Sequence, residues 1–485
     1  MKIRLIEPEP PGMHVWAKVL LPRLGLPIIA ASLKAAGHDV LIYSPQMAPI
    51  DWDDVNSAEL VGLSSTTSTA TTAYEFADAL RERGIPVVQG GSHVTFMADE
   101  ALAHSDYVAR GEGGELLMLE LVEALAGRRE LDTIAGLSYK VDGETHHNAL
   151  RERCMDLDEL PFPDLKLLIG SEKLNTMPIM TSWGCPFACN FCSVTAMFGR
   201  KYRFRSAESV VAEIEDKRPT RIFFYDDNFA ADKKRLKTLL RLMIAEGITV
   251  PWGAQVRTDV VRDRELLELM RASVADFVAL GLESVNQATL DGYEKSQTVE
   301  DIEKSIRILH DYGIRSHGMF VLGADSDTED AVRDTVDFAL KNHIDTVMLN
   351  ILTPLPGTQQ FEELDAAGRI ITKDWYLYDA QHVVFMPKHM SPAKLQREVI
   401  RGNKRFFYSW RPVRAFLMWT AGRRKLAYNR MLEYGWCWYY ARKWESDARN
   451  RAHMQLLERQ RPPAAPPRAG AEAAPAGMAG RRKPD

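Results

Sequence analysis

Cysteine is scarce in this chain, with only 5 among 485 residues. Three of them, Cys185, Cys189 and Cys192, fall within eight positions. An odd number of cysteines crowded in this way is not the disulfide framework of a small secreted protein, so we expect a reducing compartment.

Long apolar runs are missing as well. No run approaches the roughly 18 residues of a membrane-spanning helix. Charge interrupts the apolar stretch at the N-terminus within four residues, which excludes a signal-peptide core. We therefore predict a cytoplasmic protein.

Charge is divided unevenly along the chain. The formal charge is −5, but 42 basic and 60 acidic residues give −18 over 1–400, whereas 19 basic and 6 acidic residues give +13 over 401–485. With 46% apolar residues, the chain can build two to four domains of about 150 residues each. This composition excludes a wholly disordered chain.

The first 130 residues alternate short β-rich apolar runs with helical patterns, which indicates a parallel sheet with helices on both faces. These segments are 2–7, 26–36, 39–43, 60–64, 73–83 and 86–89. Glycine-rich turns follow at 90–91 and 111–115, where such folds bind ligands by close backbone approach. Tight turns without a ligand are the alternative interpretation.

A second α/β region follows a connector that contains a hairpin at 137–149 and a proline-dense stretch at 160–164. Strand and helix patterns then alternate to about 350, which predicts a partial or complete β/α barrel with its chemistry at the carboxyl ends of the strands. Predicted strands are 221–225, 251–255, 277–282, 316–322 and 346–352, and predicted helices include 207–217, 233–245, 264–273, 299–311 and 328–342.

These patterns predict an α/β chain of five segments. They are a Rossmann-like domain over 1–135, a connector over 136–170, a barrel over 171–390, a helical region over 391–460 and a tail over 461–485. The tail is expected to be disordered because it contains almost no large apolar side chain.

The clustered cysteines have the spacing C-x3-C-x2-C, directly after an expected strand at 178–182. Three thiolates on one loop can bind three corners of a cubic iron–sulfur cluster and leave the fourth iron open to a small molecule. A structural zinc site would need a fourth ligand from Cys154, Cys437 or a histidine, and none lies at a typical zinc spacing. Inert buried cysteines fit poorly on a loop that contains glycine and proline.

A loop of this spacing after the first strand of a β/α barrel resembles the radical S-adenosylmethionine enzymes. The resemblance implies a [4Fe–4S] cluster held by Cys185, Cys189 and Cys192, whose open iron chelates S-adenosylmethionine. Reductive cleavage of that cofactor would give a 5′-deoxyadenosyl radical. Segments that resemble the family's cofactor-binding motifs follow in order at 225–229, 252–257, 281–284, 318–323 and 352–358.

Four residues in these segments are the implied S-adenosylmethionine ligands. Asp226 and Asp227 would meet the amino group of the cofactor, Arg257 would meet its carboxylate, and Glu283 lies in the segment near the ribose. Taken singly, each has a structural alternative, because the aspartates can cap a helix and Glu283 can pair with a lysine. The sequence assigns no catalytic residue beyond these ligands.

The first domain resembles the cobalamin-binding domain of the cobalamin-dependent subgroup, and with it the resemblance covers about 1–390. The turns that carry the likeness are 24–27, 62–66, 88–93 and 111–115, with 157–163 in the connector. Ser64, Ser65 and Thr66 would hydrogen-bond the nucleotide tail of cobalamin, and Gly90 and Gly91 would admit it against bare backbone.

One feature departs from many cobalamin proteins, which carry Asp-x-His-x-x-Gly after the first strand. The loop at 8–16 lacks that motif. Either cobalamin binds without a protein histidine below the cobalt, or this domain has lost the cofactor. His14 and His93 are predicted to be structural histidines and not metal ligands.

The resemblance implies a methyltransferase. In this subgroup one S-adenosylmethionine methylates cobalamin, a second yields the radical that removes a substrate hydrogen, and the methyl group then reaches an unreactive carbon or phosphorus. We expect methylation of an unactivated carbon in a hydrophobic or natural-product-like substrate. A non-methylating oxidative cyclase or rearrangement enzyme is the alternative within the family, and a non-catalytic, metal-stabilised binding protein is the alternative outside it.

The C-terminal region gives the only indication of partners. Residues 401–460 include 14 basic, 4 acidic and 13 aromatic residues, interleaved most densely at 405–411 and 434–444. This pattern suits a helical cap on the acidic barrel or contact with a membrane surface, and we do not expect nucleic acid. The expected partners are a lipid-like or tetrapyrrole substrate and an electron donor such as a reductase, flavodoxin or ferredoxin.

Overall fold

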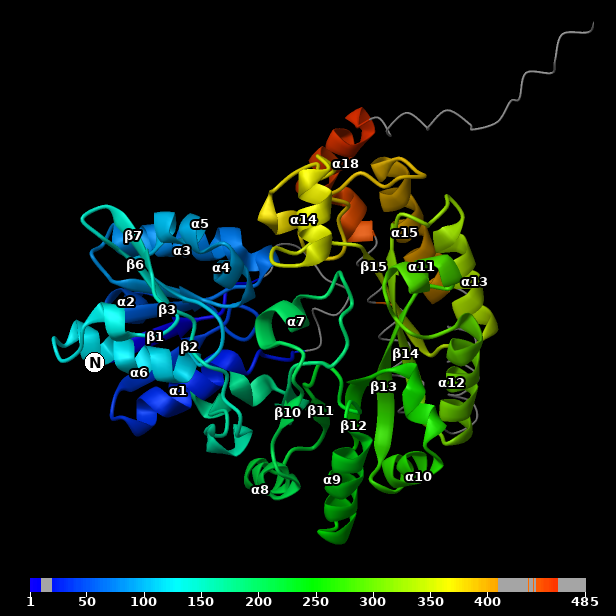
Figure 1. The fold of residues 1–485 in the computed structure, drawn as a ribbon, viewed down its shortest axis with the longest axis horizontal. Coiled ribbons are helices and arrows are strands. Elements are labelled where there is room, and N and C mark those ends of the chain that lie inside the picture. The colour runs from blue at the N-terminus through cyan, green and yellow to red at the C-terminus, as the bar shows by residue number, and fades with distance from the viewer. Residues whose placement is uncertain (10–19, 409–434, 436–438, 440–441, 461–485) are drawn as a thin grey trace, which may run out of the picture.

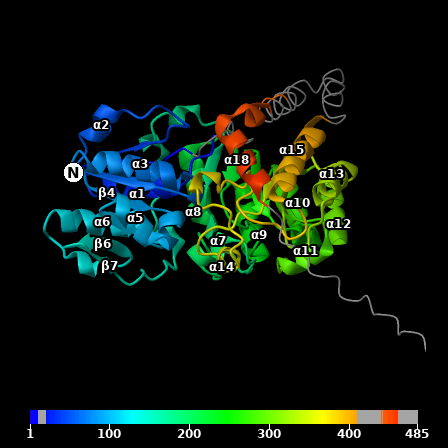
Figure 2. The same ribbon diagram turned by 90° about the horizontal axis from the view of Figure 1, so that it is seen from above.

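The computed structural model describes residues 1–9, 20–408, 435, 439 and 442–460. Two α/β units lie side by side, one with strands up to residue 147 and the other with its main sheet between residues 177 and 351 (Figure 1). They stay side by side when the view is turned by 90° (Figure 2), so the units are neighbours and not stacked layers.

The first unit contains a seven-stranded sheet in the order β2-β1-β3-β4-β5-β6-β7. Five strands are parallel, and β6 and β7 are added antiparallel. The strands are β1 (Lys2–Ile6), β2 (Asp39–Tyr43), β3 (Leu60–Ser64), β4 (Val87–Gly90), β5 (Tyr107–Ala109), β6 (Leu137–Val141) and β7 (Glu144–His147). The helices are α1 (Gly25–Ala35), α2 (Trp52–Asn56), α3 (Ala70–Arg81), α4 (Ser92–Phe96), α5 (Ala98–His104) and α6 (Gly114–Leu125).

Side chains alternate between the two faces of the sheet along each strand, and different helices pack on each face. Ile3 and Leu5 belong to a core that includes apolar residues of α1 and α6. Ile6 belongs to a second core that includes residues of α3. The predicted sheet with helices on both faces is therefore confirmed.

The predicted hairpin forms, but it belongs to the first sheet and not to a free connector. Strand β6 pairs with β5, and Leu137 and Tyr139 are buried in the first core. This pairing satisfies hydrogen-bonding groups that β5 would otherwise expose at the sheet edge. The sheet therefore extends to residue 147, past the boundary expected at 135.

The second unit contains six parallel strands in the order β15-β14-β13-β12-β11-β8. The strands are β8 (Met177–Ile179), β11 (Ile222–Phe224), β12 (Trp252–Val256), β13 (Ala275–Glu283), β14 (Arg315–Leu322) and β15 (Thr346–Ile351). The helices between them include α8 (Ala207–Lys217), α9 (Lys233–Ala245), α10 (Arg264–Ala272), α11 (Gln287–Gly292), α12 (Val299–Asp311) and α13 (Ala331–Lys341). In the part of the chain that the structure describes, β15 and β8 are opposite edges and do not pair, so the barrel is partial.

The chain after β15 packs against both units. Helix α15 (Pro392–Tyr408) contacts α13, β15 and α18 (Ala448–Arg459), and α14 (Gln359–Ala366) lies near the same end in Figure 1. Trp375 donates its Nε1–H to Glu100 Oε1 at 2.7 Å, and Tyr376 donates its hydroxyl to Glu75 Oε1 at 3.0 Å. These bonds tie the segment before α15 to the first unit.

The predicted tail at 461–485 and most of the aromatic–cationic segments lie outside the described residues. None of the helices that the structure describes is long and apolar enough to cross a membrane.

Candidate active site

The cysteine loop begins directly after β9 (Ser182–Trp183) and ends at α7 (Ser193–Phe198), for which Cys192 is the N-cap residue. Gly184 has a φ of +84°, and a Cβ there would lie 2.8 Å from the carbonyl oxygen of Lys201, so the turn into the loop requires glycine. All three thiols are free and half-buried, and burial raises the pKa of Cys192 to about 12. Metal binding must therefore displace a proton from the Cys192 thiol.

This donor set suits a cubic cluster better than a single metal ion. Among the described residues there is no group of three or more His, Cys, Asp or Glu side chains placed to hold one ion. In a cubic cluster each thiolate binds a different iron, so three soft thiols on one loop are a suitable set. Cys154 instead bonds the carbonyl oxygen of Asp156 through its thiol at 3.0 Å, and Cys437 lies outside the described residues.

The two aspartates that follow β11 have different surroundings. Asp226 is buried and accepts hydrogen bonds from the backbone nitrogens of Thr181 and Ser182 at 2.7 and 2.8 Å. It therefore ties the end of β11 to the chain just before the cysteine loop. Asp227 is half-buried and lines a cavity, and burial, followed by the nearby Asp226 carboxylate, raises the pKa of Asp227 to about 6.

Arg257 lies at the end of β12, against the cysteine loop. Its guanidinium carbon is 3.7 Å from the ring centroid of Phe187, which stands between Cys185 and Cys189. The guanidinium also donates to the carbonyl oxygen of Lys295. These contacts hold a fixed positive charge beside the thiols.

Glu283 ends β13 with a φ of +61°, where the pairing with β14 shifts register. Its Oε1 lies 2.5 Å from the Nζ of Lys295, and both side chains are buried. A Cβ on Gly281 would lie 2.7 Å from that Oε1 and 2.9 Å from that Nζ, so the ion pair packs directly against the backbone at Gly281. The lysine partner that the sequence left open for Glu283 is therefore present.

Two residues of this network, Lys295 and Gln297, were not predicted. Gln297 donates its Nε2–H to the carbonyl oxygen of Leu282 at 3.0 Å and accepts from the hydroxyl of Thr258 at 2.8 Å. The segment 295–297 thus connects the carboxyl ends of β12 and β13. The neighbouring sequence carries no motif that singles these residues out.

A cavity of about 320 Å³ lies between the two units. This volume falls at the lower end of the range for small-molecule sites. The first unit supplies the glycine-rich turns that follow its parallel strands, and the second supplies residues around the cysteine loop. The residues from the second unit are Met180, Ser182, Trp183, Phe198, Tyr225 and Asp227.

Bare backbone forms part of the cavity wall. Gly91 has a φ of +111°, and a Cβ there would lie 2.2 Å from the carbonyl oxygen of Ser65. Ser64 and Gly90 line the cavity beside Gly91. Ser65 is only 1% exposed and Thr66 caps the short turn at Thr67–Thr69, and neither lines the cavity. Such a glycine cradle suits a flat or extended ligand such as the cobalamin tail.

The cavity wall formed by the described residues contains no histidine. The ring centroid of His93 is 4.9 Å from that of Trp375, and its Nε2 lies 3.6 Å from Glu100 Oε1. His14 lies outside the described residues. The described residues of the cavity wall therefore supply no histidine ligand for cobalt.

Known proteins resemble both units. The second unit matches the Radical SAM superfamily over residues 179–339, and the first matches the B12 binding domain over residues 16–119. An uncharacterized methyltransferase of Pyrococcus horikoshii is 31% identical over 395 residues, which cover 78% of this chain and 85% of the relative. The chain belongs to the cobalamin-dependent radical S-adenosylmethionine enzymes.

Other relatives of this radical S-adenosylmethionine enzyme have names that state a reaction. Bacteriochlorophyllide d C-12(1)-methyltransferase of Chlorobaculum tepidum is 28% identical over 78% of this chain and 82% of the relative. Hopanoid C-3 methylase of Methylococcus capsulatus is 27% identical over 83% of this chain and 79% of the relative. Anaerobic magnesium-protoporphyrin IX monomethyl ester cyclase of Rubrivivax gelatinosus is 29% identical over 81% of this chain and 74% of the relative. Methyl transfer is thus favoured, with ring formation as the alternative.

A solved structure agrees with the fold. OxsB, a cobalamin-dependent S-adenosylmethionine radical enzyme with aqua-cobalamin bound, aligns with a TM-score of 0.70 and 17% identity over 93% of this chain and 74% of that chain. The predicted family, the fold class and the cofactor set of a [4Fe–4S] cluster, S-adenosylmethionine and cobalamin are confirmed.

Proposed function

We propose that this enzyme methylates an unactivated carbon of a small, hydrophobic, polycyclic substrate. The observation that carries the proposal is a single cavity lined by the glycine-rich turns of the cobalamin-binding unit and by Asp227 beside the cysteine loop. A methyl carrier and a radical source can act on one substrate only if both can reach it, and a shared cavity meets that requirement.

The residues around the cysteine loop have the following proposed roles. Cys185, Cys189 and Cys192 hold the cluster and leave one iron open. Asp227 accepts hydrogen bonds from the amino group of S-adenosylmethionine, and Arg257 donates to its carboxylate. When bound, the cluster with S-adenosylmethionine supplies a carbon radical and cobalamin supplies a methyl carrier.

The remaining predicted residues act further from the reacting atoms. Asp226 is occupied by backbone donors and so positions Asp227. Glu283, held by Lys295, would accept from the ribose hydroxyls. Ser64 and Gly91 would contact the cobalamin tail together with Gly90, whereas Ser65 and Thr66 shape the turn behind them.

The substrate class is proposed from the relatives and the cavity wall. The relatives' names state bacteriochlorophyllide and hopanoid substrates, both of which are polycyclic and largely apolar. Trp183 and Phe198 stack with ring centroids 5.9 Å apart on the cavity wall, and such aromatic surfaces suit a flat apolar partner. The electron donor and the membrane contact expected from the sequence remain predictions.

The proposed reaction can be tested with anaerobically reconstituted protein. Under reduction, the enzyme is expected to form 5′-deoxyadenosine and S-adenosylhomocysteine, and a tetrapyrrole or hopanoid substrate is expected to gain the mass of one methylene. Formation of 5′-deoxyadenosine without S-adenosylhomocysteine would point to a cyclase. Formation of neither product would exclude both reactions.

Substitutions at the two aspartates should separate their roles. Asp226→Asn is expected to lower the free energy of unfolding by about 1–3 kcal/mol. One oxygen of Asp226 accepts from both backbone nitrogens and the other accepts from the Thr181 hydroxyl, so an amide nitrogen would face a donor in either orientation. Asp227→Asn is expected to keep the fold and to weaken S-adenosylmethionine binding by at least about tenfold. Anaerobic chemical denaturation and equilibrium binding measure the two effects. Equal losses of stability in both variants would contradict this assignment.

The pH dependence of stability gives an independent check on Asp227. Its pKa in the folded protein, about 6, lies above the ordinary value of 3.8, so its favourable contribution to stability is complete below about pH 4 and is lost as the pH rises through 6. In protein without iron or cofactors, Asp227→Asn is therefore expected to raise the melting temperature at pH 8 and to leave it unchanged near pH 4. A lower melting temperature at pH 8 would contradict the burial of an unpaired carboxylate.

A further inference from the structure

A buried ion pair joins the two units beside the shared cavity. Arg203 donates two parallel hydrogen bonds to the carboxylate of Glu112, each 2.7 Å long, and the two side chains are only 1% and 3% exposed. Paired bonds of this kind fix direction as well as distance. Because Glu112 belongs to the first unit and Arg203 to the second, the pair is one of the contacts that fix how the units sit against each other.

Glu112 is part of the wall that we propose binds cobalamin. It stands in the turn between β5 and α6 and lines the cavity. The glycines on either side, Gly111 and Gly113, have φ values of +76° and +81°, which most other residues would not adopt without strain. The carboxylate is therefore carried by a turn of defined shape.

Arg203 contacts the chain on both sides of the cysteine loop, at Trp183 before it and at Phe198 after it. On β10 (Arg203–Phe204) it pairs directly with Trp183, two residues before Cys185. It also donates to the carbonyl oxygen of Phe198, the last residue of α7, at 3.1 Å. A further bond to the carbonyl oxygen of Cys154, at 2.8 Å, holds the guanidinium from the connector side.

We infer that Glu112 and Arg203 are positioning residues that hold the cysteine loop at one distance from the cobalamin-binding wall. The inference rests on the proposed function, since it requires both cofactors in the places proposed. A buried guanidinium with partners on both units cannot shift without leaving a charge unpaired in a medium of low polarity. When an enzyme holds two reacting groups in a fixed geometry, a displacement of about 1 Å between them can lower the reaction rate by about 100-fold.

The test measures the distance between the cofactors in the holoenzyme. The reduced cluster and cob(II)alamin are both paramagnetic, so pulsed electron paramagnetic resonance reports their dipolar coupling. In samples matched for iron and cobalamin content, Glu112→Gln is expected to broaden or shift the wild-type distance distribution. The ratio of S-adenosylhomocysteine to 5′-deoxyadenosine is expected to fall by about 10-fold or more in the same variant.

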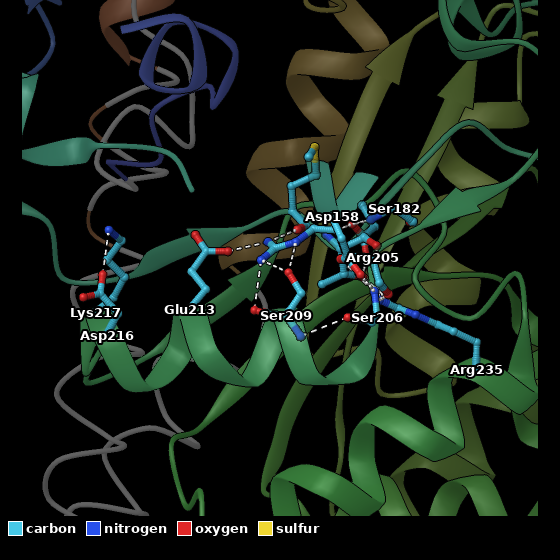
Figure 3. Close-up of polar contacts among 12 residues, drawn as sticks. Asp158, Ser182, Arg205, Ser206, Ser209, Glu213, Asp216, Lys217 and Arg235 are labelled. Atoms are coloured by element: carbon cyan, nitrogen blue, oxygen red, sulfur yellow. Dashed lines mark hydrogen bonds and ion pairs between the residues drawn. The ribbon is translucent and has the colours of Figure 1, made fainter. Parts of the chain in front are cut away.

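The second unit offers a matched control. Arg205 and Glu213 form an ion pair with side chains 4% and 2% exposed, and Figure 3 shows Glu213 on α8, within the second unit. Glu213→Gln removes a comparable buried charge without crossing between the units. It is expected to lower the melting temperature and to leave the distance distribution narrow and unshifted.

The outcomes separate this inference from the proposed function. A wild-type distance distribution in Glu112→Gln, or a change of equal size in Glu213→Gln, would overturn the positioning role. If Glu112→Gln does not fold, Arg203→Lys is measured in its place, because lysine keeps the positive charge and loses the paired hydrogen bonds. An unchanged distance distribution in Arg203→Lys would overturn the positioning role equally. Absence of any cob(II)alamin signal in the wild-type enzyme would overturn the proposed function and this inference together.

Discussion

Cys185→Ala is expected to remove the iron–sulfur cluster and to abolish reductive cleavage of S-adenosylmethionine. Two thiolates cannot hold three corners of a cubic cluster, and the described residues offer no group of neighbouring metal ligands as a substitute. The Cys185 side chain is half-buried and small, so its truncation should cost no more than about 1 kcal/mol of stability. Iron content, visible absorption and 5′-deoxyadenosine formation measure the effect.

Cys154→Ala is the matched control for this prediction. Cys154 is also a free, half-buried thiol, but it lies in the connector and its thiol bonds a backbone oxygen. The control should keep wild-type iron content and 5′-deoxyadenosine formation, because its backbone bond to Arg203 does not involve the thiol. Undiminished cleavage in Cys185→Ala, or tightly bound zinc in place of iron, would refute the cluster assignment.

Gly91→Ala is expected to lower the cobalamin content of the purified enzyme by about tenfold or more. The new Cβ would lie 2.2 Å from the carbonyl oxygen of Ser65, so either the turn after β4 or the end of β3 must move. The φ of +111° adds strain of about 1–3 kcal/mol for any residue with a side chain. Both effects act on the cavity wall, and a loss of about 1.4 kcal/mol of binding free energy already corresponds to tenfold.

Gly84→Ala is the control that introduces the backbone strain of a positive φ without the steric clash expected at Gly91. Gly84 lies in the same unit with a φ of +74°, and a Cβ there would meet nothing within 4 Å. This variant should lose some stability but keep its cobalamin, as judged by the corrin absorption of the purified protein. Equal cobalamin loss in both variants would indicate a general effect on the fold, and full retention in Gly91→Ala would place the corrin elsewhere.

Elements with a strong local pattern were predicted closely. The helices α8, α9 and α12 have the expected bounds, and each is preceded by a side chain that caps its first turn, Ser206, Asp232 and Thr298. The strands β2 and β3 also have the expected bounds. The place of the hairpin was not predicted, because the edge that β6 joins is defined only once β5 lies in the sheet.

The candidate site was predictable in part. The order of motifs behind the cysteine loop follows from the order of strands in a β/α barrel, so it could be recognised without the structure. Which side chain of a motif reaches the site depends on the local backbone. Asp226 turns to the backbone of Thr181 and Ser182 while its neighbour Asp227 lines the cavity, and Ser65 is covered while Ser64 is not.

By itself the sequence placed three thiols within eight residues of one loop, and the resemblance of this loop and the motifs behind it to a known family implied the cofactors. The sequence also determined the two-unit α/β architecture, since hydrophobic periodicity is a local property. Only the tertiary structure decided that the barrel stays open, that the cavity is shared, and that Glu112 meets Arg203 across 91 positions of sequence. Such contacts depend on how two separately built units dock, and no local pattern of residues encodes that docking.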